Sequence, residues 1–239
     1  MFKKRPKLTM LPTLESEQWR VFKLAKDPTL RYQAINEIYQ QQCQLTDIAM
    51  IESGVLDKDN YYEIATPRFT KANGDLLLQA AYTFTLDFDF NNVSDFAWLL
   101  THCGLEPKSS GKTYTTLEKF DSNSAYVCFQ KSFISLPYQS NNLLKRYREA
   151  NRDVILGRSI LEDELYPFED GKLIMNKSLW LVLDKVNDGK SCRVSYFHKC
   201  MLPMVQPNTL KPYAAIALAQ CPITSCNASR QTNMSSRRR

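Results

Sequence analysis

The sequence predicts an α+β fold in which a curved antiparallel sheet surrounds a C-terminal helix and two helices precede the sheet. Three runs rich in Val, Ile, Leu, Tyr and Trp follow one another at about 153–162, 172–186 and 191–201. Turn-forming residues separate these runs, which favours consecutive antiparallel strands. Helical periodicity appears before this region and resumes after it, which favours an α+β fold.

The breaks between the three strands are turns with a physical cause. Pro167 and Gly171 mark the first break. Asn187, Asp188 and Gly189 mark the second, because these residues accept the positive φ angles that a tight hairpin needs. The last two runs should therefore form a hairpin.

Alternation assigns the faces of these strands, since successive side chains point to opposite sides. In the first strand Val154, Leu156, Arg158 and Ile160 share one face. In the second strand both faces are apolar near the middle, with Trp180 and Val182 on one side and Leu179, Leu181 and Leu183 on the other. One face should meet a core helix, and the other a second layer or a ligand.

The N-terminal third is expected to be helical. Thr13 can cap a helix over 14–26. Asp27 and Pro28 open a second, amphipathic helix of about 24 residues that ends near Ser53 and Gly54. A coiled-coil partner helix is the alternative, but the heptads are not sustained, so we expect this helix to pack against its own domain.

The middle of the chain adds further elements. Residues 55–75 are expected to form a loop with a short strand near 62–64, and 76–90 alternates like a half-buried strand. Asn92 should cap a helix over 93–102 that stops at Gly104. Strands are expected at 113–120 and 124–136, a loop at 137–146, and a helix that begins near Pro207 or at Pro212.

Composition excludes several classes of protein. The 239 residues suit one domain of generous size, and no apolar run approaches the ~20 residues of a membrane-spanning helix. No apolar segment follows the basic start, which predicts a cytoplasmic location. Seven Cys, an odd number, argue against a disulfide framework. With two His in the whole chain, we expect no metal site and no cofactor.

The net charge of +6 comes from the two ends of the chain. Residues 1–8 and 227–239 each carry four basic residues and no acid, so the rest of the chain has a net charge of −2. We therefore expect no nucleic-acid partner. The basic ends are candidates for peripheral contact with an anionic membrane, although solvated tails are the more frequent case.

One stretch resembles a known family. Residues 152–158, Arg-Asp-Val-Ile-Leu-Gly-Arg, resemble the Arg-Asp-aromatic-Val-x-x-Arg strand of START (StAR-related lipid-transfer) domains. The strand led by Gly171, the hairpin, and Leu202-Pro203 before a last helix follow in the order of that family. Within the family the chain is most similar to the START-like domains of oomycete mating-specific and zinc-finger-linked proteins. Their strand pattern YxExxRxVIxxRS is matched by Tyr147, Glu149, Arg152, Val154, Ile155, Arg158 and Ser159. The resemblance spans about 80–204.

The resemblance implies a helix-grip fold and non-catalytic binding of a hydrophobic ligand, such as a lipid or sterol, between the sheet and the C-terminal helix. In START domains the Arg at the position of Arg158 reaches into the lipid cavity and pairs with an acid on the preceding strand. Here Gln130 and Lys131 occupy that strand. The candidate ligand-binding residues are Arg158, Leu156, Ile160, Trp180, Val182, Gln130 and Tyr196.

The alternative function is a protein-interaction or regulatory module that has the same fold and a filled core. A catalytic role is not expected, because the acids Glu162, Asp163 and Glu164 are interpreted as solvated turn residues and His198 as an edge residue. We expect a monomer with a basic disordered start at 1–12, helices at 13–54, a START-like domain at 55–220 and a disordered basic tail at 221–239.

Overall fold

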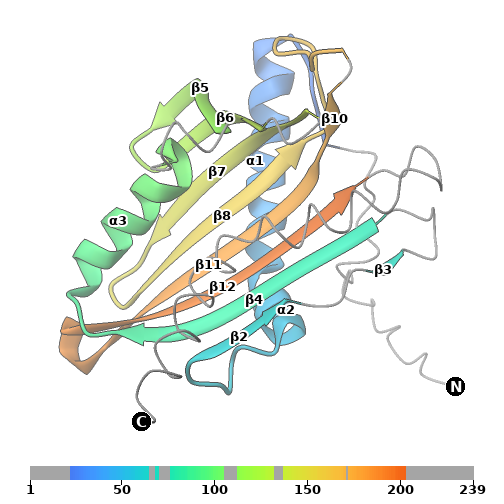
Figure 1. Ribbon diagram of the computed structural model, residues 1–239. Coiled ribbons are helices and arrows are strands. Elements are labelled where there is room, and N and C mark those ends of the chain that lie inside the picture. The colour runs from blue at the N-terminus through green and yellow to red at the C-terminus, as the bar shows by residue number, and fades with distance from the viewer. Residues whose placement is uncertain are drawn as a thin grey trace, which may run out of the picture.

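The computed structural model describes residues 22–64, 68–69, 76–104, 112–131, 137–170 and 172–202. The predicted α+β class is confirmed: a large antiparallel sheet is covered by three helices (Figure 1). Along the sheet, neighbouring strands run β2 (Tyr61–Ile64), β4 (Leu76–Leu86), β12 (Ser191–Leu202), β11 (Asn176–Val186), β8 (Arg152–Ile160), β7 (Tyr138–Arg148), β6 (Ser124–Lys131) and β5 (Lys112–Asp121).

Four short strands complete the described sheets. β3 (Arg68–Phe69) pairs antiparallel with β4, and β10 (Leu173–Ile174) pairs parallel with β7. β1 (Lys23–Leu24) and β9 (Glu162–Asp163) form a separate parallel pair. Strand β8 follows the loop after β7 at its first end and leads directly into β9 of this small pair at its other end.

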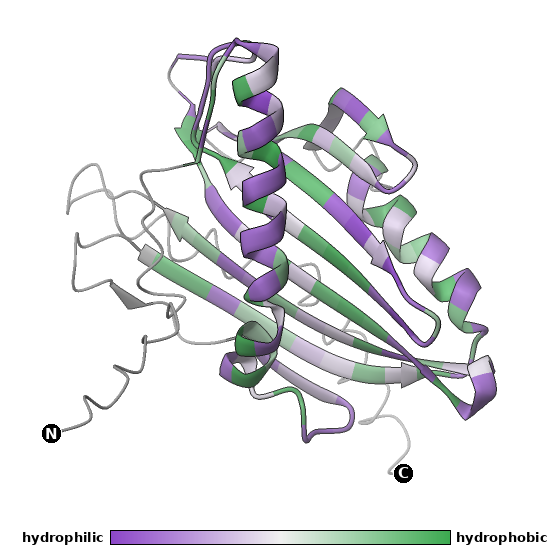
Figure 2. Ribbon diagram, turned by 180° about the vertical axis from the view of Figure 1, so that it is seen from behind, coloured by the Kyte–Doolittle hydropathy of each residue, from purple (hydrophilic) through white to green (hydrophobic). Residues whose placement is uncertain are grey.

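Helices cover both faces of the sheet. The helices α1 (Pro28–Gln44) and α2 (Thr46–Ser53) lie on one face, and α3 (Phe90–Cys103) lies on the other (Figures 1 and 2). The outer side of α1 is mostly hydrophilic in Figure 2, as expected for a helix that buries one stripe. The prediction that this helix packs within its own chain is confirmed, because the hydroxyl of Tyr39 donates to the backbone carbonyl of Leu144 at 3.1 Å.

The expected helix of about 24 residues is in fact two helices. Asp27 caps α1 as predicted, since its carboxylate accepts from the amide of Leu30 at 2.9 Å, and Gly54 ends α2 with a φ of 67°. The break falls at Leu45, which is buried in the same apolar cluster as Met50 of α2. Turning the chain there lets both helices follow the curved sheet.

The prediction of a helix over 14–26 is wrong at the C-terminal end of that range. Residues 23 and 24 form strand β1, and the carbonyl of Phe22 accepts from the amide of Leu161 at 2.9 Å. This extended segment buries Phe22 and Leu24 against the sheet, which a helix in that place would not do. Residues 14–21 lie outside the described part of the chain.

Two further helix and strand assignments need correction. α3 is capped by Asp89, whose carboxylate accepts from the amide of Asn92 at 3.0 Å, so the helix begins three residues before the predicted Val93. Gly104 ends it as expected, with a φ of 59°. The strand expected over 172–186 starts only at Asn176, because Leu173 and Ile174 pair with β7 instead.

The segment 137–146, expected to be a loop, is most of strand β7. Its polar residues are buried inside the sheet, where they satisfy one another. Gln139 donates to Asn141 at 3.2 Å, and Ser140 donates to Asn142 at 2.9 Å. Asn and Ser have low strand propensity, so the pattern misled the prediction. The predicted C-terminal helix and both basic ends lie outside the described residues.

Candidate functional site

Six of the seven predicted ligand-binding residues share one face of the sheet, as alternation and the strand register require. In the strand register Trp180 lies opposite Leu156, and Val182 lies opposite Val154. Arg158 and Ile160 continue the same face of β8. This face carries α1 and α2, and Leu156, Ile160 and Trp180 are fully buried there. These positions form a packed core against α1 and α2, whereas the predicted cavity involves a C-terminal helix that lies outside the described residues.

Arg158 is held by its own chain. Its Nη1 donates to the Asn176 side chain at 2.7 Å and to the Lys177 carbonyl at 2.6 Å, and its guanidinium lies 3.9 Å from the ring centre of Phe22. The side-chain amide of Gln130 is bonded elsewhere: it donates to the carboxylate of Glu169 at 2.8 Å. Arg158 therefore ties β8 to β11 rather than projecting into a ligand space.

Trp180 is likewise part of the core. Its indole N–H donates to the carbonyl of Gln42 at 3.2 Å, and its ring stacks on Phe197 with centres 5.8 Å apart. A buried Trp that has its N–H satisfied and its ring covered needs no ligand to complete it. Of the predicted site residues, Tyr196 alone lies on the opposite face, because it pairs with Leu181.

On this opposite face, which also carries α3, aromatic rings form a row across β4 and β12. Tyr82 stacks on Tyr196 with centres 4.4 Å apart, and Phe84 and His198 extend the row at 5.6 and 6.3 Å from their neighbours. These side chains are half-buried, in contrast to the closed core on the other side. We call this set, Tyr82, Phe84, Tyr196 and His198, the aromatic row.

Beside the aromatic row the same face becomes polar. Strands β7, β8 and β11 bring Ser140, Asn142, Ser159 and Lys177 to it. The amide of Lys177 donates to the hydroxyl of Ser159 at 2.7 Å. Between row and polar strip lies Gly157, where a Cβ would sit 3.0 Å from Leu179 and 3.2 Å from Leu144. Glycine is needed there because the neighbouring leucines approach the backbone so closely.

His198 and Cys200 of this face have pKa values that leave them uncharged near neutral pH. Burial, together with the charge of Lys177, lowers the pKa of His198 to about 3. Burial raises the pKa of the Cys200 thiol to about 11. The described face therefore combines half-buried aromatic rings with the ammonium group of Lys177, whereas the hydroxyls of Ser140 and Ser159 are fully buried.

A buried ionic cluster fixes α3 over one end of this face. Arg146 of β7 donates to Asp153 at 2.8 Å and to Asp95 of α3 at 2.8 Å. Ser94 of α3 also donates to Asp153. Removing one member would leave a buried charge without its partner, so the cluster holds α3 in place. Neighbouring apolar residues of α3, such as Trp98, then cover part of this face.

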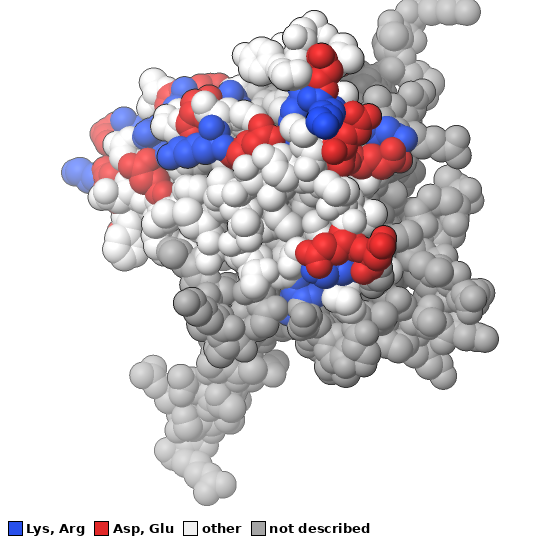
Figure 3. Space-filling model, turned by 90° about the horizontal axis from the view of Figure 1, so that it is seen from above, with Lys and Arg blue, Asp and Glu red and all other residues white. Residues whose placement is uncertain are grey.

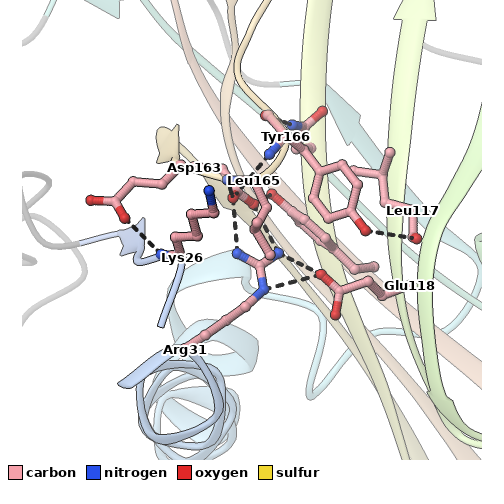
Figure 4. Close-up of polar contacts among 10 residues, drawn as sticks. Lys26, Arg31, Leu117, Glu118, Asp163, Leu165 and Tyr166 are labelled. Carbon is pink, nitrogen blue, oxygen red and sulfur yellow. Dashed lines mark hydrogen bonds and ion pairs between the residues drawn. The ribbon is translucent and has the colours of Figure 1, made fainter. Parts of the chain in front are cut away.

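A second ionic cluster lies on the α1 side and was missed by sequence reasoning (Figure 4). The guanidinium of Arg31 makes two hydrogen bonds to Asp163, at 2.8 and 3.0 Å, and two to Glu118, at 3.0 and 2.6 Å. Tyr126 donates to Asp163 at 2.8 Å. The interpretation of Asp163 as a solvated turn residue is thus wrong, because this carboxylate is buried.

The charge of Asp163 is maintained by its partners. Burial alone would raise the pKa of this carboxyl, but hydrogen bonds from Arg31, the Leu165 amide and Tyr126 outweigh burial and hold the pKa below its usual value. A surface hollow of about 290 Å³ adjoins the cluster and is lined in part by Tyr32, Phe120 and Leu165. Since the guanidinium of Arg31 and both oxygens of the Asp163 carboxylate are engaged within the cluster, we assign it a structural role.

Three further kinds of feature were considered for the described residues: a metal site, a membrane-spanning helix and a surface patch of one charge. No three His, Cys, Asp or Glu side chains in them gather as a metal site requires. No described helix has the length and apolar character needed to cross a membrane. Basic and acidic side chains adjoin one another on the face in Figure 3, so this view shows no patch of a single sign.

Comparisons with known proteins found similar solved structures. No family model and no curated protein matches it. Human STARD10 aligns over 70% of this chain and 70% of its own, with 8% identity and a TM-score of 0.47. Human StAR-related lipid transfer protein 5 aligns over 74% and 92%, with 10% identity and a TM-score of 0.44. The lipid transfer and protein localization domain of human StarD13 aligns over 73% and 91%, with 9% identity and a TM-score of 0.42. These structures include StAR-related lipid-transfer domains, and a specific relation to oomycete proteins stays a prediction.

Proposed function

We propose that the chain binds a hydrophobic ligand such as a lipid or sterol, without catalysis, on the face of the sheet that carries α3. One observation supports this above all: the aromatic row lies half-buried beside a polar strip on a single face of the sheet. Ligand sites are usually apolar surfaces with a few convergent polar groups that fix orientation. The opposite face is a closed core and leaves no room for a ligand at Trp180 or Leu156.

Binding without chemistry agrees with the state of the titratable groups. With a pKa of about 3, His198 is a weak base, and with a pKa of about 11 the Cys200 thiol is not ionised near neutral pH. A general base or a thiolate nucleophile needs a pKa closer to the working pH. We therefore propose that the polar groups of this face orient the ligand, that no cofactor takes part, and that the chain acts as a cytoplasmic monomer.

The alternative is a protein-interaction module with a filled interior. The observation that favours it is the closed packing around Arg158, where a family resemblance predicts a cavity. The two functions differ in what the α3 face holds, so a binding experiment on that face separates them.

The test is a titration of the purified full chain with two fluorescent probes, dehydroergosterol and a dansyl-labelled undecanoic acid. We expect saturable binding of at least one probe, weakened about tenfold in Tyr196→Ala because an aromatic contact is lost. Tyr32→Ala is the matched control, since Tyr32 is exposed on the outer side of α1. If neither probe binds, the proposed function is wrong and the interaction module is the better assignment.

A further inference from the structure

Apolar side chains lie exposed where α1 begins, on the side of the sheet opposite to the ligand face, as we call the face that carries α3. Tyr32 of α1, Phe120 of β5 and Leu165, which follows β9, are 64%, 36% and 40% exposed. All three line the surface hollow of about 290 Å³. Single exposed apolar residues are ordinary on a protein surface, but side chains from three separate segments that converge on one hollow indicate an interaction site.

The inner part of the hollow is held in place by the fold. Ile35 and Arg31 of α1 also line the hollow, and both side chains are buried. The guanidinium of Arg31 is fixed by its hydrogen bonds to Asp163 and Glu118 (Figure 4). Because few groups in a preformed hollow need to be ordered on binding, more of the contact energy remains as affinity.

The charges around the hollow nearly cancel. Lys26 and Arg31 line it with two positive charges, while Glu118 in the lining and Asp163 beneath Arg31 carry two negative ones. Glu164 lies close by, since its carboxylate accepts from the backbone amide of Lys26 at 2.7 Å. An anion attracted by Lys26 is repelled by Glu118 and Glu164. A cation attracted by Glu118 is repelled by Arg31 and Lys26. The hollow therefore selects an uncharged group.

The size of the hollow selects a single side chain. Its volume of about 290 Å³ is just under the roughly 300–1,000 Å³ of small-molecule sites. With about half of each side chain exposed, Tyr32, Phe120 and Leu165 present roughly 250 Å² of surface. A stable interface buries about 800 Å² on each partner, so these residues supply less than a third of what a dimer of this chain needs. One anchor side chain on a short segment, by contrast, matches a hollow of this size.

We propose that this hollow docks a short segment of a partner protein, which inserts one uncharged aromatic side chain between Tyr32, Phe120 and Leu165. Aromatic side chains are the usual anchors of protein interfaces, because they bring a large contact area at a low cost in conformational entropy. This inference goes beyond the proposed function and is independent of what the ligand face holds.

The experiment selects peptides on the purified full chain from a phage-displayed library of random short sequences. We expect the enriched peptides to share one Trp, Tyr or Phe. The peptide with the highest affinity is then synthesised with a fluorescein label and titrated by fluorescence polarisation. Tyr32→Ala and Leu165→Ser should each weaken its binding about tenfold, because each removes a contact of the anchor. Replacing the aromatic residue of the peptide by Ala should weaken binding at least as much.

Phe88→Ala is the matched control. Phe88 is 67% exposed, so this variant removes an aromatic ring about as accessible as that of Tyr32, but Phe88 precedes α3 and does not line the hollow. The variant should bind the peptide as the wild type does. Equal weakening by Phe88→Ala and Tyr32→Ala would indicate unspecific adhesion to exposed rings and overturn the docking site.

The remaining outcomes are equally decisive. A selection that enriches no peptide, or peptides that bind Tyr32→Ala and Leu165→Ser as tightly as the wild type, would overturn the inference. Enrichment of a charged residue in place of the aromatic one would overturn the uncharged anchor. A concentration-dependent dimer in sedimentation velocity, abolished by Tyr32→Ala, would assign the hollow to a second copy of the chain and overturn the partner segment.

The same variants separate this inference from the proposed function. Tyr32→Ala should bind dehydroergosterol and the dansyl-labelled acid as the wild type does, because Tyr32 lies on the opposite side of the sheet from the ligand face. Failure of both lipid probes, with peptide binding that depends on Tyr32, would overturn the proposed function and support the docking site.

Discussion

The carboxylate of Asp163 accepts two hydrogen bonds from the guanidinium of Arg31, which lies 132 residues earlier in the chain. The pair joins helix α1 to strand β9, and Glu118 joins the same guanidinium to β5. The rings of Tyr126 and Tyr166 lie 5.6 and 5.5 Å from the guanidinium carbon. A buried charge pair in this position sets where α1 lies on the sheet.

We expect Asp163→Asn to destabilise the fold by about 3–5 kcal/mol, because it leaves the buried Arg31 without its main counter-charge. The measurement is the free energy of unfolding in urea. Glu162→Gln is the control, since Glu162 is exposed in its ion pair with Lys23 and such pairs contribute little. A loss below about 1 kcal/mol for Asp163→Asn would show that the cluster does not fix α1.

Arg158→Leu should lower stability by about 1–3 kcal/mol, because the Asn176 side chain and the Lys177 carbonyl each lose a buried donor. It should leave the affinity for the acid and sterol probes unchanged, since Arg158 lies on the core face. Leu156→Ala is the companion variant and should cost ~2–5 kcal/mol through the cavity that it leaves. Weakened probe binding in folded Arg158→Leu would instead place the ligand on the α1 side.

The sequence predicted best where a single residue type determines the backbone. Asn187, Asp188 and Gly189 all adopt positive φ, at 50°, 53° and 90°, and the hairpin follows as expected. The faces of β8 and β11 also followed from alternation alone. What alternation does not specify is the layer that each face meets. For that reason Arg158 was assigned to a ligand face although α1 and Phe22 cover it.

The missed features depend on contacts between distant parts of the chain. Arg31 has the sequence context of a solvated helix residue, and its burial depends on Asp163 and Glu118. Strand β7 was missed because Gln139, Asn141 and their neighbours satisfy one another only once the sheet has formed. A buried polar strand of this kind has no local apolar signal, so propensity and periodicity both favour a loop.

Stability should fall as the pH drops below the ordinary His pKa of 6.5, because His198 has a pKa of about 3 in the folded state. Between these values the unfolded chain binds a proton that the folded chain does not, so stability is fully present above pH 6.5 and is lost as the pH falls. The slope contributed by this residue is up to about 1.4 kcal/mol per pH unit.

Urea unfolding at about pH 7, 6 and 5 measures this slope while most carboxylates stay ionised. His198→Asn should flatten it. The same series on His102→Asn controls for the loss of a histidine as such. An unchanged slope in His198→Asn would show that the imidazole is protonated in the folded protein as easily as in the unfolded one.

Gly157 lies on the ligand face, between the aromatic row and the polar strip. A Cβ added there would stand 3.0 Å from the Cβ of Leu179 and 3.2 Å from a methyl group of Leu144. The Leu144 methyl can rotate away, but the Cβ of Leu179 moves only with the backbone of β11. Gly157→Ala should therefore cost about 1–3 kcal/mol of unfolding free energy by overpacking. It should also displace Leu179 and Lys177 on the ligand face and so weaken binding of the acid probe.

Leu144→Ala relieves only the flexible contact, so the double variant Gly157→Ala/Leu144→Ala should not recover acid binding. Recovery of full affinity in that double variant would show that the strain lies at Leu144 and that the backbone of β11 had not moved.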